Sequence, residues 1–345
     1  MSDNIIKLVI GDDEFKFWSS FNITQSIDTF DTFDFDAPFG ENSGIKDVIK
    51  PLQFKPGQLF IDDELLSTIV LLNPVPTIGD SNSISVSGYG KPGVLNDCSV
   101  KFSDYPLEFN NQTLEQIAKT LASLFDVSVE FSEPSGAPFG KVRVDGFGEK
   151  KGTPFSFLIK LAKERGFLIS NTPDGKILFW KLDQNAVTTT LKEGHTPLLN
   201  VTANINPQGY YSEITGLGTI FYIKDTEAVT INNKNLNINR PFVYKTKNKL
   251  TGADLQNAVK WKVGLMIANA IKYSIDVQGM RDERGKVWKP NTFINLTAPS
   301  AYINNETKFV IKNLNLAKSG SEMTTMNLVL PESYTGEIPE RLPWD

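Results

Sequence analysis

The chain has 345 residues, 40% of them hydrophobic, with 35 lysines and arginines against 40 aspartates and glutamates. This length exceeds what one hydrophobic core usually fills, so we expect several domains. The net charge of −5 disfavours a protein that grips nucleic acid phosphates, although nucleic acid could slide past such a surface. One cysteine excludes an intramolecular disulfide, and one histidine leaves little scope for a zinc site or a Ser-His-Asp triad.

The first hundred residues have the short strands and regular turns of a β-barrel or sandwich. Within them, the segment from Ile23 to Phe39 alternates with a period close to two. Its aromatic and aliphatic positions share one parity and its carboxylates share the other, namely Asp28, Asp34 and Asp36. We predict one long strand, with a β-bulge at Phe30-Asp31, a buried aromatic face and an acidic face toward water. That acidic face is either an ordinary solvated strand face or a functional surface.

The stretch ISVSGYGKPGVLNDCSV, residues 84–100, contains a literal G-x-G-x-x-G from Gly88 to Gly93. A dinucleotide site needs a helix directly after this motif, but a short turn-like segment and then β-branched residues follow. Pro92 also removes one amide donor from the loop. We therefore interpret the glycines as a tight turn that needs positive φ or close backbone approach. Cys98 has no histidine nearby and is expected to be a buried packing residue.

Helical patterns begin after this stretch. Thr113 and Gln116 form a predicted capping box before an amphipathic helix, and Thr153-Pro154 is a second helix start, with a stop at Gly166. Strands and a hairpin around Pro173-Asp174-Gly175 complete a compact α/β segment over residues 107–182. From residue 198 the pattern is all-β again, apart from a predicted helix over 251–273 and an Asn-rich loop at 232–239.

The resulting prediction is a β-rich α+β chain with two β-barrel-like domains, each interrupted by an inserted helix-containing segment. The first barrel domain covers residues 1–106 and is completed by strands near 183–200, around the α/β insert at 107–182. The second covers 198–240 and 291–331, around a helix-strand insert at 241–290. Residues 332–345 have no periodicity and are expected to form a peripheral C-terminal extension. No cofactor or metal site is predicted.

Enzyme and lectin-like alternatives stay open at this point. A glycoside hydrolase needs only two carboxylates at a set separation, and Glu108, Glu115, Glu130, Glu133 and Asp145 are available. A carbohydrate-binding β protein would present exposed aromatic rings on one face. His195 lies in Glu-Gly-His-Thr-Pro, which indicates a surface turn. The start of the sequence lacks the features of a signal peptide, and no apolar run could span a membrane, so we expect no Sec export and no membrane insertion.

The order of three segments resembles the baseplate hub proteins of Mu-like contractile-tailed phages, within the broader late-control tail proteins. These are the stretch at 84–100, the helix-strand-helix-hairpin unit at 107–182, and IDVQGMRDERGKVWKP at 275–290. The Asn-rich loop and the tail have no clear counterpart in this resemblance.

The resemblance implies a non-enzymatic structural protein of the virion baseplate, assembled in the host cytoplasm. It implies a homotrimeric ring that joins the six-fold tail tube protein to the three-fold central spike protein. Other baseplate wedge proteins would surround this ring, and DNA would pass through it without specific binding. Asp28, Asp34 and Asp36 are then candidates for an acidic surface facing the channel, where like charge would keep DNA from adhering. A tail-associated cell-wall glycoside hydrolase and a carbohydrate-binding β protein are the alternatives.

Overall fold

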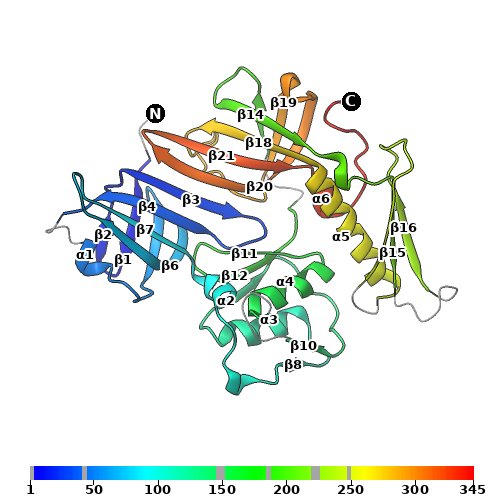
Figure 1. The fold of residues 1–345 in the computed structure, drawn as a ribbon, viewed down its shortest axis with the longest axis horizontal. Helices are drawn as coiled ribbons and strands as arrows, with labels where there is room; N and C mark the ends of the chain where they lie inside the picture. The colour runs from blue at the N-terminus through cyan, green and yellow to red at the C-terminus, as the bar shows by residue number, and fades with distance from the viewer. Residues whose placement is uncertain (1–3, 41–44, 145–151, 184–187, 219–225, 247–249) are drawn as a thin grey trace.

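The computed structural model describes residues 4–40, 45–144, 152–183, 188–218, 226–246 and 250–345 (Figure 1). Most of its strands belong to one 13-stranded sheet with the order β14-β18-β21-β20-β3-β4-β7-β6-β5-β1-β2, in which β19 pairs with β20 and β13 pairs with β19. The strands are β1 (Ile6–Ile10), β2 (Asp13–Phe15), β3 (Ser20–Ser26), β4 (Thr32–Pro38), β5 (Pro56–Ile61), β6 (Glu64–Thr77), β7 (Ser83–Gly90), β13 (Thr188–Lys192), β14 (Leu198–Ile205), β18 (Ile271–Gln278), β19 (Phe293–Ala298), β20 (Ile303–Ser319) and β21 (Ser321–Val329).

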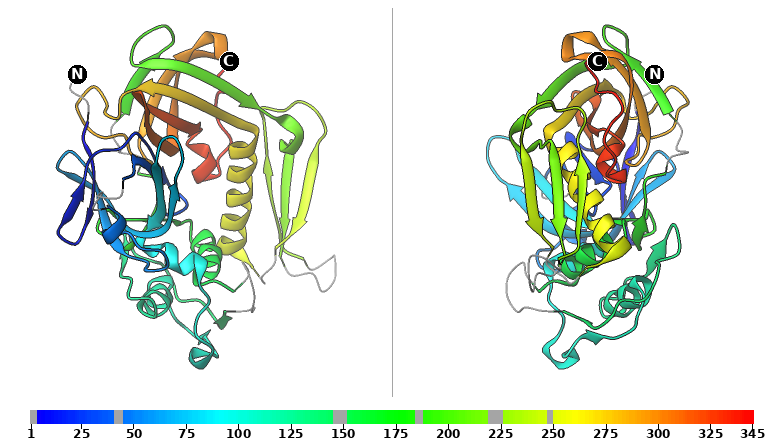
Figure 2. Two further views of the ribbon diagram at one scale, coloured as in Figure 1. Left: turned by 60° about the vertical axis from the view of Figure 1, so that its left-hand side comes forward. Right: turned by 90° about the vertical axis from the view of Figure 1, so that its right-hand side faces the viewer.

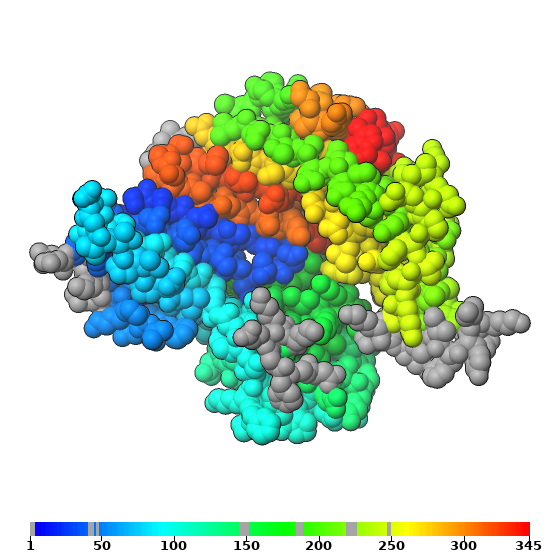
Figure 3. Space-filling model, in the orientation of Figure 1, coloured from blue at the N-terminus to red at the C-terminus, as the bar shows by residue number. Residues whose placement is uncertain are grey.

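The two ends of the chain meet in the middle of this sheet. β20 pairs antiparallel with β3, from Asn313 opposite Ser26 to Lys318 opposite Phe21. In Figure 3 the blue N-terminal strands and the orange C-terminal strands accordingly lie side by side. The predicted β-rich α+β fold class is confirmed, and strands from both predicted β regions share one continuous sheet.

The predicted long strand over residues 23–39 is wrong. β3 and β4 form a hairpin instead, paired from Ser20 opposite Asp36 to Thr24 opposite Thr32. The break in alternation at Phe30-Asp31 marks a turn, in which the Ser26 hydroxyl donates a 2.8 Å hydrogen bond to Asp28. The apolar residues before the turn and those after it, such as Ile27 and Phe33, all fall at odd-numbered positions. The sequence pattern therefore resembles one interrupted strand.

The strands near 183–200 also differ from expectation, because they do not complete the first barrel. β13 pairs parallel with β19, and β14 pairs antiparallel with β18. Both therefore extend the C-terminal part of the sheet. Leu191 and Leu198 are buried there, so the apolar positions that suggested strands are correct while the predicted partners are not.

The first insert packs its own core below the sheet in Figure 1. The single turn α2 (Val94–Asp97) leads into it, and it contains β8 (Glu108–Phe109), α3 (Leu114–Ser123), β9 (Val129–Phe131), β10 (Val142–Arg143), α4 (Pro154–Glu164), β11 (Leu168–Asn171) and β12 (Ile177–Trp180). The capping box of Thr113 and Gln116 and the Thr153 cap with Pro154 at N1 are confirmed. We call residues 107–180 the inserted unit below.

A second, three-stranded sheet stands away from the main sheet, with α5 (Gly252–Ala270) between them (Figure 2). Its order is β16-β15-β17, formed by β16 (Ala228–Asn232), β15 (Glu213–Leu217) and β17 (Pro241–Lys245). Leu255, Val259 and Ile214 are buried where the helix and this sheet meet. The predicted boundary at residue 240 therefore does not separate barrel from insert, because β15 and β17 are hydrogen-bonded neighbours.

The C-terminal segment is not a peripheral extension. After α6 (Glu332–Thr335), Ile338, Leu342 and Trp344 pack against the main core. Asn235, from the predicted Asn-rich loop, donates to the Pro339 carbonyl at 2.8 Å, and Asn304 donates to that of Trp344 at 2.8 Å. These amides satisfy backbone carbonyls of an irregular segment, which explains how a sequence without periodicity holds a fixed path.

Candidate functional site

One face of the main sheet is polar across seven neighbouring strands. Its side chains, which we call the polar wall, are exposed or half-buried. They are Ser20, Asn22, Thr24, Thr32, Asp34, Asp36, Ser83, Ser85, Ser87, Tyr89, Asn200, Thr202, Asn204, Lys272, Ser274, Asp276, Gln278, Asn313, Asn315, Ala317, Met323, Thr325 and Asn327. The alternate residues of the same strands, such as Phe35, Leu316 and Ile275, are buried in the core. Strand alternation thus separates an apolar face from a hydrated one.

The polar wall carries few charges for its extent. Amides and hydroxyls dominate it, and its ionisable side chains at neutral pH are Asp34, Asp36, Asp276 and Lys272. It contains no arginine. Partial burial, and then the neighbouring Asp36, raise the pKa of Asp34 above its usual value. Ser20 donates a 2.6 Å hydrogen bond to Asp36, and Thr325 donates one of 2.7 Å to Asp276.

The structure separates the three predicted acidic residues. Asp34 and Asp36 lie on the same face of β4 and belong to the polar wall. Asp28 lies in the β3–β4 turn, where its carboxylate is 3.5 Å from the Lys312 ammonium group. It borders a small cavity between α4, α5 and α6. The turn at residues 27–31 removes Asp28 from the strand parity that suggested a common surface.

The three glycines of the G-x-G-x-x-G stretch serve close packing. A Cβ at Gly88 would lie 2.1 Å from the Val70 carbonyl oxygen, and one at Gly93 would lie 2.4 Å from the Tyr89 ring. At Gly90 it would lie 3.0 Å from the side chain of Asn171. Close approach is thus confirmed as their role. The predicted tight turn is wrong for Gly88 and Gly90, which belong to strand β7, and positive φ is not found, because Gly90 and Gly93 have φ near −55°. The single turn α2 follows them, and Cys98 is exposed, contrary to the expectation of burial.

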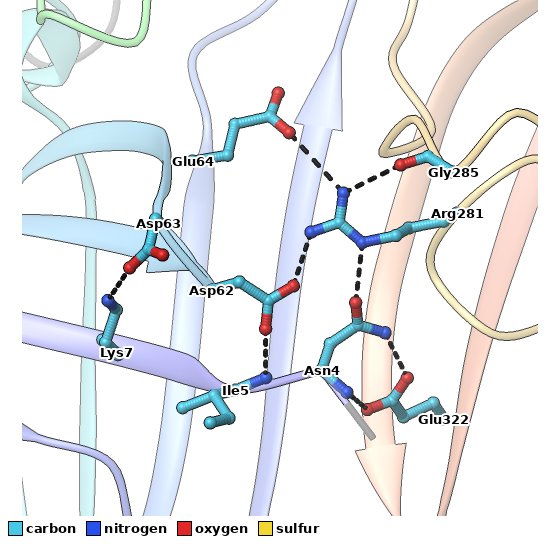
Figure 4. Close-up of polar contacts among 9 residues, drawn as sticks. All are labelled: Asn4, Ile5, Lys7, Asp62, Asp63, Glu64, Arg281, Gly285 and Glu322. Atoms are coloured by element: carbon cyan, nitrogen blue, oxygen red, sulfur yellow. Dashed lines mark hydrogen bonds and ion pairs between the residues drawn. The ribbon is translucent and has the colours of Figure 1, made fainter. Parts of the chain in front are cut away.

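A cluster of polar contacts around Arg281 joins the two ends of the chain (Figure 4). The guanidinium group donates to Asn4 at 2.8 Å, to Asp62 at 2.7 Å and to the Gly285 carbonyl at 3.1 Å. Asn4 in turn donates to Glu322 through its backbone N–H at 2.7 Å and its amide at 2.6 Å. We call Asn4, Asp62, Arg281 and Glu322 the clasp. Nothing in the sequence pattern indicated it, because its members are up to 318 positions apart.

Removing the clasp arginine is expected to destabilise the fold. Arg281→Ala leaves Asp62 and Asn4 without their shared donor, which we expect to lower the free energy of unfolding by about 1–2 kcal/mol. The groups are partly exposed, so the effect is smaller than that of a buried ion pair. Urea denaturation followed by circular dichroism measures it. Lys7→Ala is the control, because Lys7 bonds only the fully exposed Asp63 in this region, and an equal effect of both changes would contradict the role of the clasp.

The carboxylates considered for hydrolysis are bound separately to lysines. Glu108, Glu115, Glu130 and Glu133 form ion pairs with Lys141, Lys119, Lys176 and Lys181 respectively, at 2.7 to 3.1 Å. Asp145 lies outside the described residues. His195 is exposed in a turn, where its Nδ1 lies 3.0 Å from the Glu193 carbonyl oxygen. Each of the four described glutamates therefore has a different lysine as its ion-pair partner.

A groove of about 1290 Å³ separates the inserted unit from the loop after β18. Trp180, Arg284 and Trp288 line it. Charges at its sides are paired, since Lys289 lies 2.9 Å from Glu64 and Lys181 lies 2.9 Å from Glu133. Within the described ranges no group of three or more His, Cys, Asp or Glu side chains could hold a metal, and no helix is long and apolar enough to cross a membrane.

A carbohydrate-binding β protein would present exposed aromatic rings on one face. Among the described residues, Phe17, Phe54, Phe102 and Tyr302 are exposed, and they come from four segments that are far apart in the sequence.

Comparison with known proteins identifies similar chains. Residues 92–181 match a family model described as the second domain of gp44-like baseplate hub proteins. Residues 251–337 match the fourth domain of the Mu phage baseplate assembly protein GpP. Over 254 residues the chain is 24% identical to the baseplate hub protein gp44 of Escherichia phage Mu, covering 69% of this chain and 64% of the Mu protein.

Two solved structures have nearly the whole fold. A 43 kDa tail protein of prophage MuSo2 from Shewanella oneidensis superposes with a TM-score of 0.82 at 22% identity, covering 96% of this chain and 99% of that one. A tail protein from Neisseria meningitidis MC58 gives 0.79 at 19% identity, covering 97% and 99%. The resemblance to Mu-like baseplate hub proteins is confirmed, and the chain has the fold of a baseplate hub-like phage tail protein.

Proposed function

From this likeness we propose that the chain is a structural hub of a contractile phage tail baseplate. Three copies form a ring that joins the six-fold tail tube above to the three-fold spike below, and DNA passes through the ring. Its work is mechanical, and no catalytic residue is assigned. The polar wall is the observation that carries this proposal, together with two stretches of open strand edge, on β14 and on part of β6.

The composition of the polar wall suits a surface past which DNA moves. A protein that binds DNA neutralises phosphates with lysine and arginine, and each such contact raises affinity. The wall offers amides and hydroxyls, three carboxylates and one lysine. Its Asp34 and Asp36 repel a passing phosphate backbone. The hydrated neutral side chains carry no positive charge that could bind the phosphates. We therefore place this face toward the channel, and leave Asp28 out because it is paired with Lys312.

The sheet has two places where another copy could continue it. Within the described part of the chain β14 pairs only with β18, and residues 73–77 of β6 pair only with β7. Strand direction alternates from β14 to β6, so a second copy would bring its β14 antiparallel to β6 of the first. Two different edges meeting in this way form a head-to-tail contact, which closes into a ring when the rotation between neighbouring copies divides a full turn evenly.

Exposed apolar side chains stand at both edges. Leu199 on β14 is 56% exposed, and Val75 on β6 is 46% exposed. Pro74 and Pro76 have no N–H to offer, as is usual for an edge strand, so contact at β6 would depend largely on side chains. An edge with free backbone groups can pair with further chains without limit, and the prolines of β6 restrict such pairing. A junction made largely by side chains is therefore compatible with a ring of a fixed number of copies.

The mass of the purified chain in solution tests the ring. We expect native mass spectrometry or light scattering to give three times the 38.4 kDa chain mass, with a central hole visible by electron microscopy. Leu199→Arg places a charge at the β14 edge and is expected to shift the population to monomers. The matched control is Leu124→Arg on the inserted unit, another exposed leucine away from both edges. A wild-type chain that stays monomeric at high concentration would count against the ring.

A further inference from the structure

The β3–β4 turn is where the inserted unit docks on the main sheet. Ser170 donates to the Ser26 carbonyl at 2.8 Å, and the Trp180 indole donates to the Ile27 carbonyl at 2.9 Å. Thr68 on β6 donates to the Pro173 carbonyl at 2.8 Å. Docking therefore combines hydrogen bonds to this turn and to β6, an ion pair between Arg165 and Asp254, and apolar packing that includes Phe30.

Asp31 and Asn171 form the buried centre of this contact. Asp31 is 4% exposed, and its backbone N–H donates to the Asn171 amide oxygen at 2.8 Å. The Asn171 amide nitrogen donates to the Asp31 carboxylate at 2.9 Å. Gly90 leaves room for this amide, because a Cβ there would lie within 3.0–3.3 Å of its three outer atoms. Both ends of the Asn171 amide thus bind Asp31, the oxygen through the Asp31 backbone and the nitrogen through its carboxylate.

No cation faces the Asp31 carboxylate in the described part of the chain. Its side-chain partners are neutral, namely Asn171, Ser67 and Gln25, whose amide nitrogen lies at 3.3 Å. Charged residues on the neighbouring elements are engaged elsewhere or face away. Asp34 and Asp36 lie on the opposite face of β4. Asp28 forms an ion pair with Lys312, and Glu64 forms one with Lys289. The aliphatic part of the Lys91 side chain packs at Gly175. A full negative charge is therefore buried without a counter-ion, which is costly.

A protonated Asp31 carboxyl would have a hydrogen-bond acceptor within reach, the side-chain amide of Gln25. The Gln25 amide oxygen is buried and has no hydrogen-bond partner. Rotating that amide by half a turn exchanges its oxygen and nitrogen, so the oxygen would take a position about 3.3 Å from the Asp31 carboxyl. A protonated carboxyl could then donate to Gln25 while still accepting from Asn171.

We propose that Asp31 and Asn171 form a proton-sensitive latch between the main sheet and the inserted unit, and that proton uptake tightens the docking. When the unit is docked, burial raises the pKa of Asp31 from its ordinary value of 3.8 to about 6. An Asp31 exposed by undocking returns to the ordinary value. Between pH 3.8 and about pH 6, the docked state therefore holds one proton more than the undocked state. The stability of the docked state falls as the pH rises through about 6, because this extra proton is lost. At neutral pH the unit is held more loosely against the sheet than in mild acid.

Hydrogen exchange of the intact chain tests the latch. The amides to follow are those of Gly90, Asp31 and residues 168–172, after correction for the intrinsic effect of pH on exchange. The two pKa values imply that the equilibrium constant for local opening is about tenfold larger at pH 7.5 than at pH 5. Asp31→Asn, which cannot ionise, is expected to abolish this difference. Asp36→Asn, on the solvent-facing side of the same strand, should leave it unchanged.

Two results would overturn the latch. One is opening in the wild-type chain that is equal at both pH values, and the other is a tenfold difference that persists in Asp31→Asn. Should Asp31→Asn not fold, the wild-type comparison decides alone, supported by infrared spectroscopy. A carbonyl band of a protonated carboxylic acid that fades between pH 5 and pH 7.5 would support the latch, and its absence at pH 5 would contradict it.

Discussion

Replacing Gly88 with alanine is expected to lower the free energy of unfolding by about 3 kcal/mol or more. A Cβ at this position would meet the Val70 carbonyl oxygen at 2.1 Å and the Phe33 ring at 2.7 Å. The first contact is with the backbone of the neighbouring strand β6, so no side-chain rotation can relieve it. β6 and β7 would have to separate at Leu71 and Gly88, in the middle of the sheet.

Gly79→Ala is the matched control for this change. Gly79 lies between the same two strands, and an added Cβ there would have no atom within 4 Å. We expect its effect to stay within about 0.5 kcal/mol, as for most surface substitutions. Urea denaturation followed by circular dichroism distinguishes the two. Equal denaturation midpoints for both variants would mean that the strands at Gly88 are not packed as described.

Reversing the charge of the polar wall is expected to impair the virion by at least about tenfold in plaque number. The double change Asp34→Lys and Asp36→Lys puts cations on the face that we place toward the channel, where they would attract passing phosphates. We expect assembled particles to eject DNA more slowly, as measured by DNA release in the presence of a nuclease. Higher salt should partly restore the rate, because counter-ions screen the attraction.

Two control variants separate this effect from others. Asp12→Lys with Asp13→Lys makes the same change in net charge on the β1–β2 turn and is expected to be harmless. Asp34→Asn with Asp36→Asn removes charge without reversing it and should have a small effect. If the two lysine pairs behave alike, the polar wall does not face the DNA.

Features that depend on neighbouring residues in sequence were predictable. The caps at Thr113 and Thr153 require partners only three positions away, and both are present as expected. The stop at Gly166 likewise follows from a local conformation, since its φ is +70°. The helix predicted over 251–273 forms as α5, with Leu255, Val259 and Val263 buried, because its pattern is also local.

Features that depend on long-range pairing were not predictable. β14 finds β18 through contacts such as Val201 opposite Ile275, and no local pattern selects that partner. The β3–β4 turn was mistaken for a bulge because Phe33 continues the parity of Ile27 across it. Asp34 and Asp36 could be assigned to an exposed face from alternation alone. The uncharged residues of the polar wall could not be assigned to one surface from the sequence, because that assignment requires knowing which strands are neighbours.

The pairing of β3 with β20 has a consequence for synthesis on the ribosome. β3 leaves the ribosome long before β20, the strand that completes its hydrogen bonding and ends at Ser319. The edge of β3 that will pair with β20 therefore stays exposed until β20 has been made, and contacts so distant in sequence also form slowly. The clasp cannot close earlier either, since Glu322 must first be made. We expect the nascent chain to depend on chaperones that shield this edge until the last strands arrive.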